Sequence, residues 1–180
     1  GTLTGAEIET AVEHCDGGRI LVSQLEVDHQ VVLAALTAAT NKQMVTVLNI
    51  APFNVLAPGI LDHTTWLIAN EVELEGVMGS LGVTLSLEGM SVDDVCEAIS
   101  SWSEKLGCHL IITLGEQGAV GFMDGACFSY TAYATQAIDT VGAGDCFVGY
   151  FVALLDESLP WQQALAGGVI AATQSVQSPG

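Results

Sequence analysis

The chain has 180 residues, half of them hydrophobic, which predicts one folded domain with a sizeable core rather than a disordered segment. Three Lys and Arg side chains stand against 21 Asp and Glu, so the formal net charge is −18 at pH 7. Nucleic acids and anionic membranes are bound through basic side chains, and this charge excludes both as expected partners. No apolar run approaches the roughly 20 residues of a membrane span, and no signal-like segment opens the chain. The sequence therefore predicts a soluble, cytoplasmic protein.

The cysteines and histidines form no recognisable metal-binding pattern. The five cysteines are scattered without a C-x-x-C pair, and the four histidines lack the spacing of zinc motifs. We therefore expect no structural zinc. We expect free thiols, most of them in the core, in a reducing compartment.

Short apolar runs alternate with helical patterns from residue 20 to residue 113. β-rich runs cover residues 20–24, 45–49, 65–69 and 109–113, and helical patterns cover residues 28–40, 57–61 and 91–106. Ser91 is a plausible N-cap of the last of these helices, and Gly107 a plausible stop. Continuous apolar strands in a βαβαβ order predict a doubly wound, mostly parallel sheet with helices on both faces.

The rest of the chain predicts a hairpin and two closing helices. Residues 119–123 and 126–130 are expected to form antiparallel strands at a sheet edge, joined by an Asp124-Gly125 turn. Helices are expected near residues 143–155 and 160–176. No internal repeat or linker divides the sequence, so residues 1–180 are predicted to form a single α/β domain.

The most informative segment is Asp139-Thr140-Val141-Gly142-Ala143-Gly144-Asp145, where the first closing helix begins. Gly142 and Gly144 let a ligand approach the main chain, and the free N–H groups and dipole of a first helical turn attract a phosphate. Asp145 would lie beside a transferred phosphoryl group and could accept the proton of an attacking hydroxyl. The alternative is a tight turn into a capped helix.

Several polar residues directly follow predicted strands, where ligands bind in parallel α/β sheets. These residues are Glu26, Asn49, Asn70, Thr113 and Asp139. Their common position predicts a shared site. Each has a structural alternative: an exposed loop carboxylate, a polar helix start, a strand-to-hairpin turn or a turn cap. We interpret Asn49, with Pro52, as turn-forming and structural.

The Asp139–Asp145 segment resembles the C-terminal signature of the ribokinase-like (PfkB-type) carbohydrate kinases. Four further segments match that family in the same order: Gln24-Leu25-Glu26, Asn49-x-Ala51-Pro52, Asn70-Glu71-x-Glu73 and Thr113-Leu114-Gly115-x-x-Gly118. The first two are most similar to its ribokinase branch. The resemblance covers essentially the whole chain but lacks the family's N-terminal lid strands and sugar site and its last helix. We therefore expect a ribokinase-like domain that is incomplete at both ends.

The resemblance implies ATP-dependent phosphorylation of a sugar hydroxyl, above all D-ribose to ribose 5-phosphate. It makes Asp145 the catalytic base and a sugar contact, Glu26 a further sugar contact, and the amides of Gly142, Ala143 and Gly144 an anion hole. The implied nucleotide contacts are Asn70, Thr113, Leu114, Gly115, Glu116, Gln117, Gly118 and Gly144.

The resemblance also implies two cations and one assembly. Asn70 and Glu73 would hold Mg²⁺ through water. A monovalent cation, K⁺, would be bound by Asp139, Val141, Ser175, Ser178 and Gly180. A homodimer is expected where the N-terminal lid is present.

Two alternatives remain open at this point. The chain could be another kinase of the family, acting on fructose, adenosine or a related alcohol. It could also be a non-catalytic kinase fragment that acts as an interaction module through an exposed apolar sheet edge.

Overall fold

The computed structural model describes residues 3–53 and 55–178. Its centre is a six-stranded sheet whose strands lie side by side in chain order. The first four strands are parallel, and the last two continue the sheet as an antiparallel hairpin at its edge. The strands are β1 (Ile20–Ser23), β2 (Val45–Asn49), β3 (Trp66–Asn70), β4 (His109–Thr113), β5 (Ala119–Met123) and β6 (Ala126–Tyr130). The predicted strands and hairpin are confirmed.

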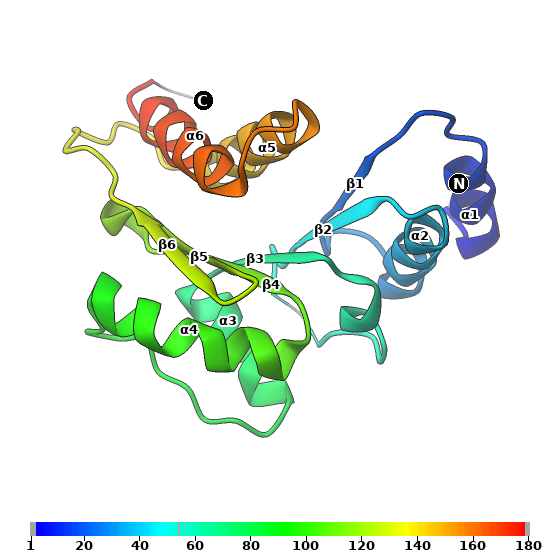
Figure 1. Ribbon diagram of the computed structural model, residues 1–180, viewed down its shortest axis with the longest axis horizontal. Helices are drawn as coiled ribbons and strands as arrows, with labels where there is room; N and C mark the ends of the chain where they lie inside the picture. Colours follow the sequence, from blue (N-terminus) through cyan, green and yellow to red (C-terminus); the bar gives the residue numbers. More distant parts are fainter. Residues whose placement is uncertain (1–2, 54, 179–180) are drawn as a thin grey trace.

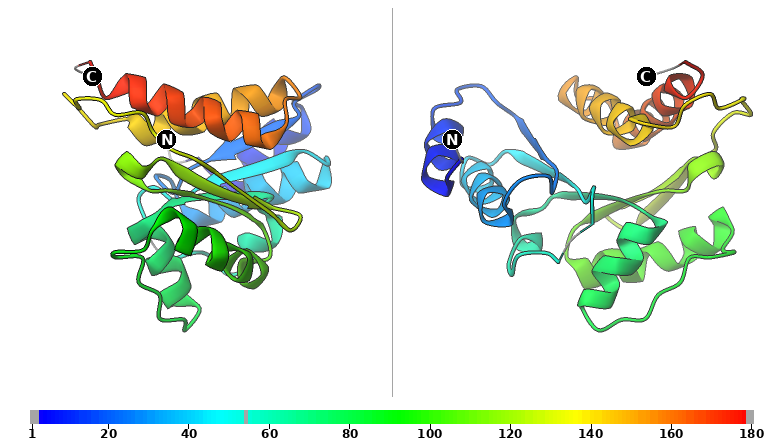
Figure 2. Two further views of the ribbon diagram at one scale, coloured as in Figure 1. Left: turned by 60° about the vertical axis from the view of Figure 1, so that its left-hand side comes forward. Right: turned by 180° about the vertical axis from the view of Figure 1, so that it is seen from behind.

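Helices cover both faces of this sheet (Figure 1). On one face lie α2 (His29–Asn41), α3 (Glu71–Ser80) and α4 (Val92–Leu106), and α1 (Gly5–Glu13) packs against α2. Figure 2 shows α5 (Ala143–Asp156) and α6 (Trp161–Ser175) lying together on the opposite face. Two short 3₁₀ turns, η1 (Leu61–His63) and η2 (Gly115–Gln117), follow β2 and β4. The predicted α/β class, with helices on both faces of a mostly parallel sheet, is confirmed.

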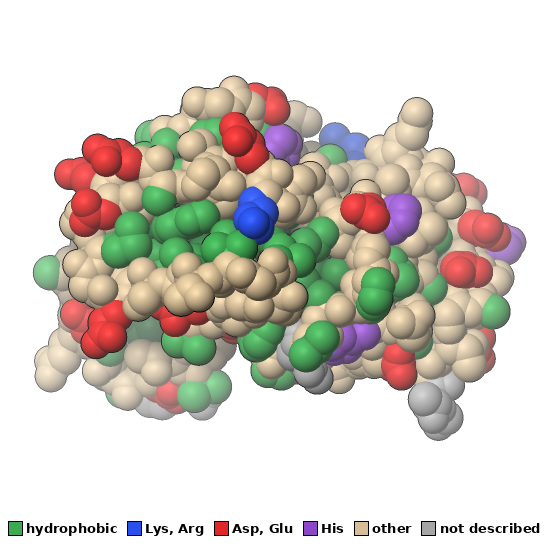
Figure 3. Space-filling model, turned by 90° about the horizontal axis from the view of Figure 1, so that it is seen from below, with side chains coloured by type: hydrophobic (Ala, Val, Ile, Leu, Met, Phe, Trp, Pro, Cys, Tyr) green, Lys and Arg blue, Asp and Glu red, His purple; other side chains and the backbone are tan. Residues whose placement is uncertain are grey.

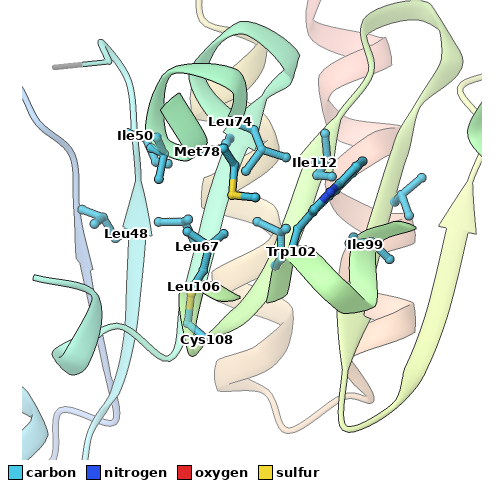
Figure 4. Close-up of a cluster of buried hydrophobic side chains, with 14 of the residues drawn as sticks. Leu48, Ile50, Leu67, Leu74, Met78, Ile99, Trp102, Leu106, Cys108 and Ile112 are labelled. Atoms are coloured by element: carbon cyan, nitrogen blue, oxygen red, sulfur yellow. The ribbon is translucent and has the colours of Figure 1, made fainter. Parts of the chain in front are cut away.

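The continuous apolar strands are explained by burial on both faces. Leu67 of β3 packs with Met78 and Trp102 in the cluster beneath α3 and α4 (Figure 4), whereas the next residue, Ile68, belongs to the cluster beneath α5 and α6. Full burial of such a side chain contributes roughly 1.5–3 kcal/mol. A polar residue at either position would therefore weaken one of the two layers.

Aromatic packing fixes α5 over the parallel strands. Trp66 of β3 contacts Phe151 edge-on, with ring centroids 5.4 Å apart, and Trp161 of α6 at 5.8 Å. Phe147, near the start of α5, is only 2% exposed and stacks with Phe151. Because these side chains anchor the start of the helix, its first turn is held beside the ends of the strands.

The helix predicted for residues 57–61 is wrong. This stretch forms turns that lead into η1. Pro58 has no backbone N–H to donate, and Gly59 has φ +83°, so a regular helix cannot continue through them. Ala57 and Ile60 are nevertheless buried, which explains the apolar pattern that suggested a helix.

Two helices were not expected from the pattern. The exposed α1 buries only Val12, and α3 contains Gly76 and Gly79, which are poor helix formers. A Cβ on Gly76 would approach the ring of Phe53 to 2.5–2.8 Å, so a larger residue there would have to displace that ring. Tertiary packing therefore overrides helix propensity in α3.

The expectation that all cysteines are free thiols is wrong for one pair. Cys96 of α4 and Cys127 of β6 form a disulfide, with Cα atoms 6.0 Å apart, while Cys15, Cys108 and Cys146 are free. The pair meets because α4 packs across the β5–β6 hairpin. Scattered cysteines can thus be neighbours in the fold.

The few basic side chains are used at helix C-termini. Lys42 Nζ donates to the carbonyl oxygens of Val12, Glu13 and Cys15 at 2.7–3.1 Å, at the end of α1. Arg19 binds Asp156, the last residue of α5, through both its carboxylate and its carbonyl oxygen. Lys105 lies in the last turn of α4. Cations in these positions complement the helix dipoles.

Acidic side chains outnumber basic ones by 21 to 3 in this chain. Figure 3 shows one face of the molecule, on which acidic side chains are spread around the rim and basic ones are scarce. Within the described part of the chain, no helix has the length and apolar character needed to cross a membrane.

Candidate functional site

A pocket of about 180 Å³ lies where β2, β3 and β4 end and α5 begins. It brings together six of the predicted site residues, which are Asn70, Glu73, Thr113, Gly142, Gly144 and Asp145. Asn49 and Ala51 also line it, although Asn49 was interpreted as structural. The Asn49 side chain is 6% exposed, and its position at the end of β2 was the signal for a site. Of the five strand-end residues expected to converge, Asn49, Asn70 and Thr113 line the pocket, whereas Glu26 and Asp139 do not.

The first turn of α5 has free backbone donors. Gly142 is the N-cap with φ +76° and provides no side-chain cap. Ala143 N donates to Thr140 O and Cys146 N to Gly142 O, whereas no acceptor within the described residues takes the N–H of Gly144 or Asp145. No atom of another segment lies within 4 Å of a Cβ built on Gly142 or Gly144. Free amides that face open space at a helix N-terminus are suited to binding an anion.

Asp145 lies in this turn and is exposed. Its Oδ1 accepts a hydrogen bond of 2.7 Å from Nε2 of Gln24, which follows β1 directly. Gln24 was noticed only as part of a motif, and nothing in the sequence pairs it with a residue 121 positions away. Its position as the last residue of the predicted run 20–24, next to Glu26, was the available signal.

Asn70 and Glu73 form a reciprocal cap at the start of α3. Asn70 Oδ1 accepts from Glu73 N at 2.9 Å, and Glu73 Oε2 accepts from Asn70 N at 2.8 Å. Burial raises the pKa of the Glu73 carboxyl above its ordinary value of 4.5, and the hydrogen bond from Asn70 partly offsets this. The pair is thus a polar helix start and also part of the pocket wall. A cation beside Glu73 would stabilise its ionised form.

The predicted nucleotide-binding residues of the turn after β4 do not all line the same pocket. Thr113 lines the pocket with Asp145, whereas Leu114 and Gln117 line a second pocket of about 630 Å³. Gly115 and Glu116 are exposed. Glu71, Glu75 and Glu88 line that second pocket, so it is unsuited to phosphate groups.

Gly118 has a structural role at the end of this turn. It is buried, and a Cβ there would collide with the carbonyl oxygen of Tyr130. Leu114 N donates to Gly118 O at 2.8 Å and closes the turn. The absent side chain therefore makes room for the chain leaving β6.

Glu26 lies outside the pocket as an exposed residue beyond β1. The segment leading to α5 meets the end of α6, because Ile138 N and Asp139 N donate to Val176 O at 2.7 and 3.2 Å. Asp139 Oδ1 accepts from Val141 N at 2.9 Å.

This contact brings two of the predicted K⁺ ligands close to the others. Asp139 and Val141 lie near the helix end that carries Ser175, and Ser178 N donates to Ser175 O at 3.3 Å. Gly180 is outside the described residues. Within those residues, no three His, Cys, Asp or Glu side chains cluster in a way that could hold a metal. A cation here would depend on carbonyl and hydroxyl oxygens.

No Lys or Arg side chain lines the Asp145 pocket among the residues that the structure describes. Arg19 and Lys42 are engaged at helix ends, and Lys105 lies on α4. Negative charge in the pocket would therefore be neutralised by backbone amides and by a bound cation.

Comparison with known proteins identifies relatives over most of the chain. Ribokinase from Staphylococcus aureus (strain COL) is 31% identical over 157 residues, which are 87% of this chain and 49% of that protein. Deoxyribokinase from Salmonella typhi is 29% identical over 182 residues, 99% of this chain and 56% of that protein. The chain thus spans about half the length of these relatives.

A solved structure agrees with the sequence relatives. Ribokinase from Cryptococcus neoformans var. grubii serotype A, in complex with ADP, has a TM-score of 0.79 at 30% identity, over 92% of this chain and 57% of that one. Residues 9–180 match the model of the pfkB family carbohydrate kinases. The fold, the Gly142–Asp145 turn and these matches agree, and the chain belongs to the pfkB family of carbohydrate kinases.

Proposed function

We propose that the protein transfers the γ-phosphoryl group of ATP to a hydroxyl of a pentose, most directly D-ribose, to give ribose 5-phosphate. The observation that carries this proposal is the first turn of α5, where the Asp145 carboxylate lies at one pocket with two amides that have no acceptor among the described residues. The relatives named ribokinase and deoxyribokinase support a pentose as the acceptor. The ADP complex of the Cryptococcus relative supports an adenine nucleotide as the donor.

In this reaction the acceptor hydroxyl loses its proton to Asp145 as its oxygen bonds to the γ-phosphorus. The bond from that phosphorus to the bridging oxygen breaks, and ADP leaves. Of the three amides predicted as the anion hole, that of Ala143 is already donated to Thr140 O, so the N–H groups of Gly142 and Gly144, with that of Asp145, would face the charge that develops on the transferred group. Such fixed donors and correct positioning supply most of the catalysis in phosphoryl transfer.

The pocket fits a requirement for Mg²⁺. Glu73 is a half-buried carboxylate whose Oε2 is used in the helix cap, and no bond within the described residues occupies its Oε1. Asn70 and Glu73 would hold the ion through water, as Mg²⁺ prefers. When bound, Mg²⁺ neutralises phosphate charge, which no basic side chain of the pocket can do.

Further parts of the proposal concern K⁺, the sugar and the setting. Asp139, Val141, Ser175 and Ser178 lie at one end of α6 and would surround K⁺ with oxygen ligands. Glu26 would contact the sugar hydroxyls. A homodimer and a cytoplasmic location are predictions of the same proposal.

The test is acceptor-dependent ADP release from Mg-ATP, with and without K⁺. Ribose, 2-deoxyribose, fructose and adenosine are compared at equal concentrations, and Mg-ATP binding is measured separately by calorimetry. We expect ribose to give the highest kcat/KM, with a lower value when K⁺ is omitted. A preference for fructose or adenosine would reassign the acceptor. Mg-ATP binding without ADP release for any acceptor would contradict the kinase proposal.

A further inference from the structure

Acidic residues at the third position of the helices make two different kinds of hydrogen bond in this protein. In α1, α3 and α4 the acidic residue three positions after the N-cap turns back and accepts from the N-cap backbone N–H. These residues are Glu7, Glu73 and Asp94. Asp145 stands at the same position of α5, three residues after Gly142, yet no such bond forms, and its Oδ1 accepts from Gln24 instead.

We infer that Gln24 is a positioning residue, which holds the Asp145 carboxylate away from its own helix terminus and toward the acceptor hydroxyl. The inference rests on the proposed phosphoryl transfer and deepens it. The N-cap of α5 also differs in conformation, because Gly142 has φ +76° whereas Thr4, Asn70 and Ser91 are extended. The 2.7 Å bond from Gln24 therefore takes the place of the reciprocal cap as the contact that orients the acidic side chain.

Gln24 is itself held in place by its neighbours. Its backbone carbonyl accepts from Ser23 Oγ at 3.2 Å, and the next residue, Leu25, donates its N–H to Ala51 O at 3.3 Å. Leu25 is 5% exposed within the core, and Ala51 lines the pocket. The Gln24 amide therefore projects from a fixed point between β1 and the end of β2, which suits a group that must orient another.

The chemistry of an amide suits this task. A neutral N–H orients one carboxylate oxygen and leaves the other for the hydroxyl proton, without the strong loss of basicity that a Lys or Arg neighbour would cause. Glu73 is the other carboxylate of the pocket, and no cationic side chain lines it among the described residues. Gln24 is also the one side chain with a described hydrogen bond to Asp145.

Two substitutions at position 24 remove the donor to Asp145 in different ways. Gln24→Ala deletes the amide that binds Asp145 Oδ1. Gln24→Glu keeps the length of the side chain but places a like charge where the donor was. A purely structural role for Gln24 would make the loss of kcat follow the loss of thermal stability in both variants.

The experiment measures kcat, the Kd for Mg-ATP and thermal stability for wild type, both variants and the control Gln163→Ala, an exposed position on α6. We expect Gln24→Ala to lower kcat by roughly 10²-fold, the cost of a ~1 Å misplacement, with the Kd for Mg-ATP and the Tm near those of wild type. Gln24→Glu should not restore kcat, because it cannot donate to the Asp145 carboxylate. Wild-type kcat in Gln24→Ala, or losses of kcat and Tm that run in parallel, would overturn the inference.

A second readout separates this inference from the proposed function. The NMR signal of the Asp145 carboxyl carbon is compared between wild type, both variants and Gln163→Ala, without any substrate. A signal displaced in both Gln24 variants but not in the control supports the positioning role even if turnover is never observed. An unchanged signal in both Gln24 variants would overturn it, whatever the activity.

Discussion

Single residues in this protein are constrained by how closely two backbones approach. Gly118 has φ +95°, and a methyl group there would meet the backbone of residues 130–132. Gly115 also has a positive φ, +54°, but a methyl group there would meet no other segment. The two glycines of one turn therefore differ in the space for a side chain, and Gly118, with ψ −128°, also lies outside the left-handed helical region.

This difference predicts unequal losses of stability. Gly115→Ala should lower the free energy of unfolding by about 1–2 kcal/mol, the usual cost of the left-handed conformation. Gly118→Ala should lower it well beyond that value, because backbone must also move. Urea denaturation of the two variants measures both, and equal losses would contradict the collision at Tyr130.

Residue contacts across the chain were the part of the site that sequence patterns could not predict. Asp145 and Gly144 were predicted from local chemistry, since a Gly-rich turn before a helix needs no tertiary information. The bond between Gln24 and Asp145 depends on how α5 lies over β1, as does the burial of Asn49 in the pocket. Polar residues at strand ends could be predicted to converge, but their partners could not.

At the scale of elements, strong local signals were predicted well and weak ones were missed. Helix α4 has its N-cap at Ser91 and its C-cap at Gly107, as expected. The β5–β6 strands also have the predicted bounds, because an Asp-Gly turn fixes the register of a hairpin. Helix α3 was missed beyond its polar start at Asn70, since Gly76 and Gly79 are poor helix formers and Gly76 packs against Phe53. An apolar pattern alone misled at residues 57–61, where Pro58 and Gly59 prevent a helix.

The capping box of α4 predicts a pH-dependent contribution to stability. The Ser91 hydroxyl and backbone N–H, bound to Asp94, hold the pKa of that carboxyl below its ordinary value of 3.8. This contribution is complete above 3.8 and is lost as the pH falls through the lowered value of the folded state.

Asp94→Ala and Asp93→Ala form a matched pair, since both residues lie in the first turn and Asp94 makes the cap. Near neutral pH, Asp94→Ala should be the less stable variant in urea denaturation. The difference should vanish well below pH 3.8. A difference that persists unchanged in acid would contradict the role of the ionised cap.

At the scale of the molecule, two layers of helices hold a sheet whose strand ends meet the start of α5. The apolar runs predicted these layers because a strand buried on both faces has no polar alternation. The disulfide could not be predicted, since Cys96 and Cys127 are neighbours only after α4 has packed across the hairpin.

The disulfide predicts how many cysteine thiols react before and after reduction. In denatured, unreduced protein three thiols should react with Ellman's reagent, and all five after reduction. Cys96→Ser should lower the free energy of unfolding by about 2–4 kcal/mol, whereas the exposed Cys15→Ser should leave it near wild type. Five reactive thiols before reduction would contradict the pair.

We propose that Asp145 accepts the proton of the acceptor hydroxyl while the amides around it bind phosphate. One variant separates these two roles. Asp145→Asn keeps the shape of the side chain and the backbone donors but cannot accept the proton. We predict a loss of kcat of roughly 10²–10⁴-fold with a Kd for Mg-ATP near that of wild type, and no change in either for the control Asp62→Asn, an exposed residue of η1. Wild-type turnover in Asp145→Asn would contradict the account.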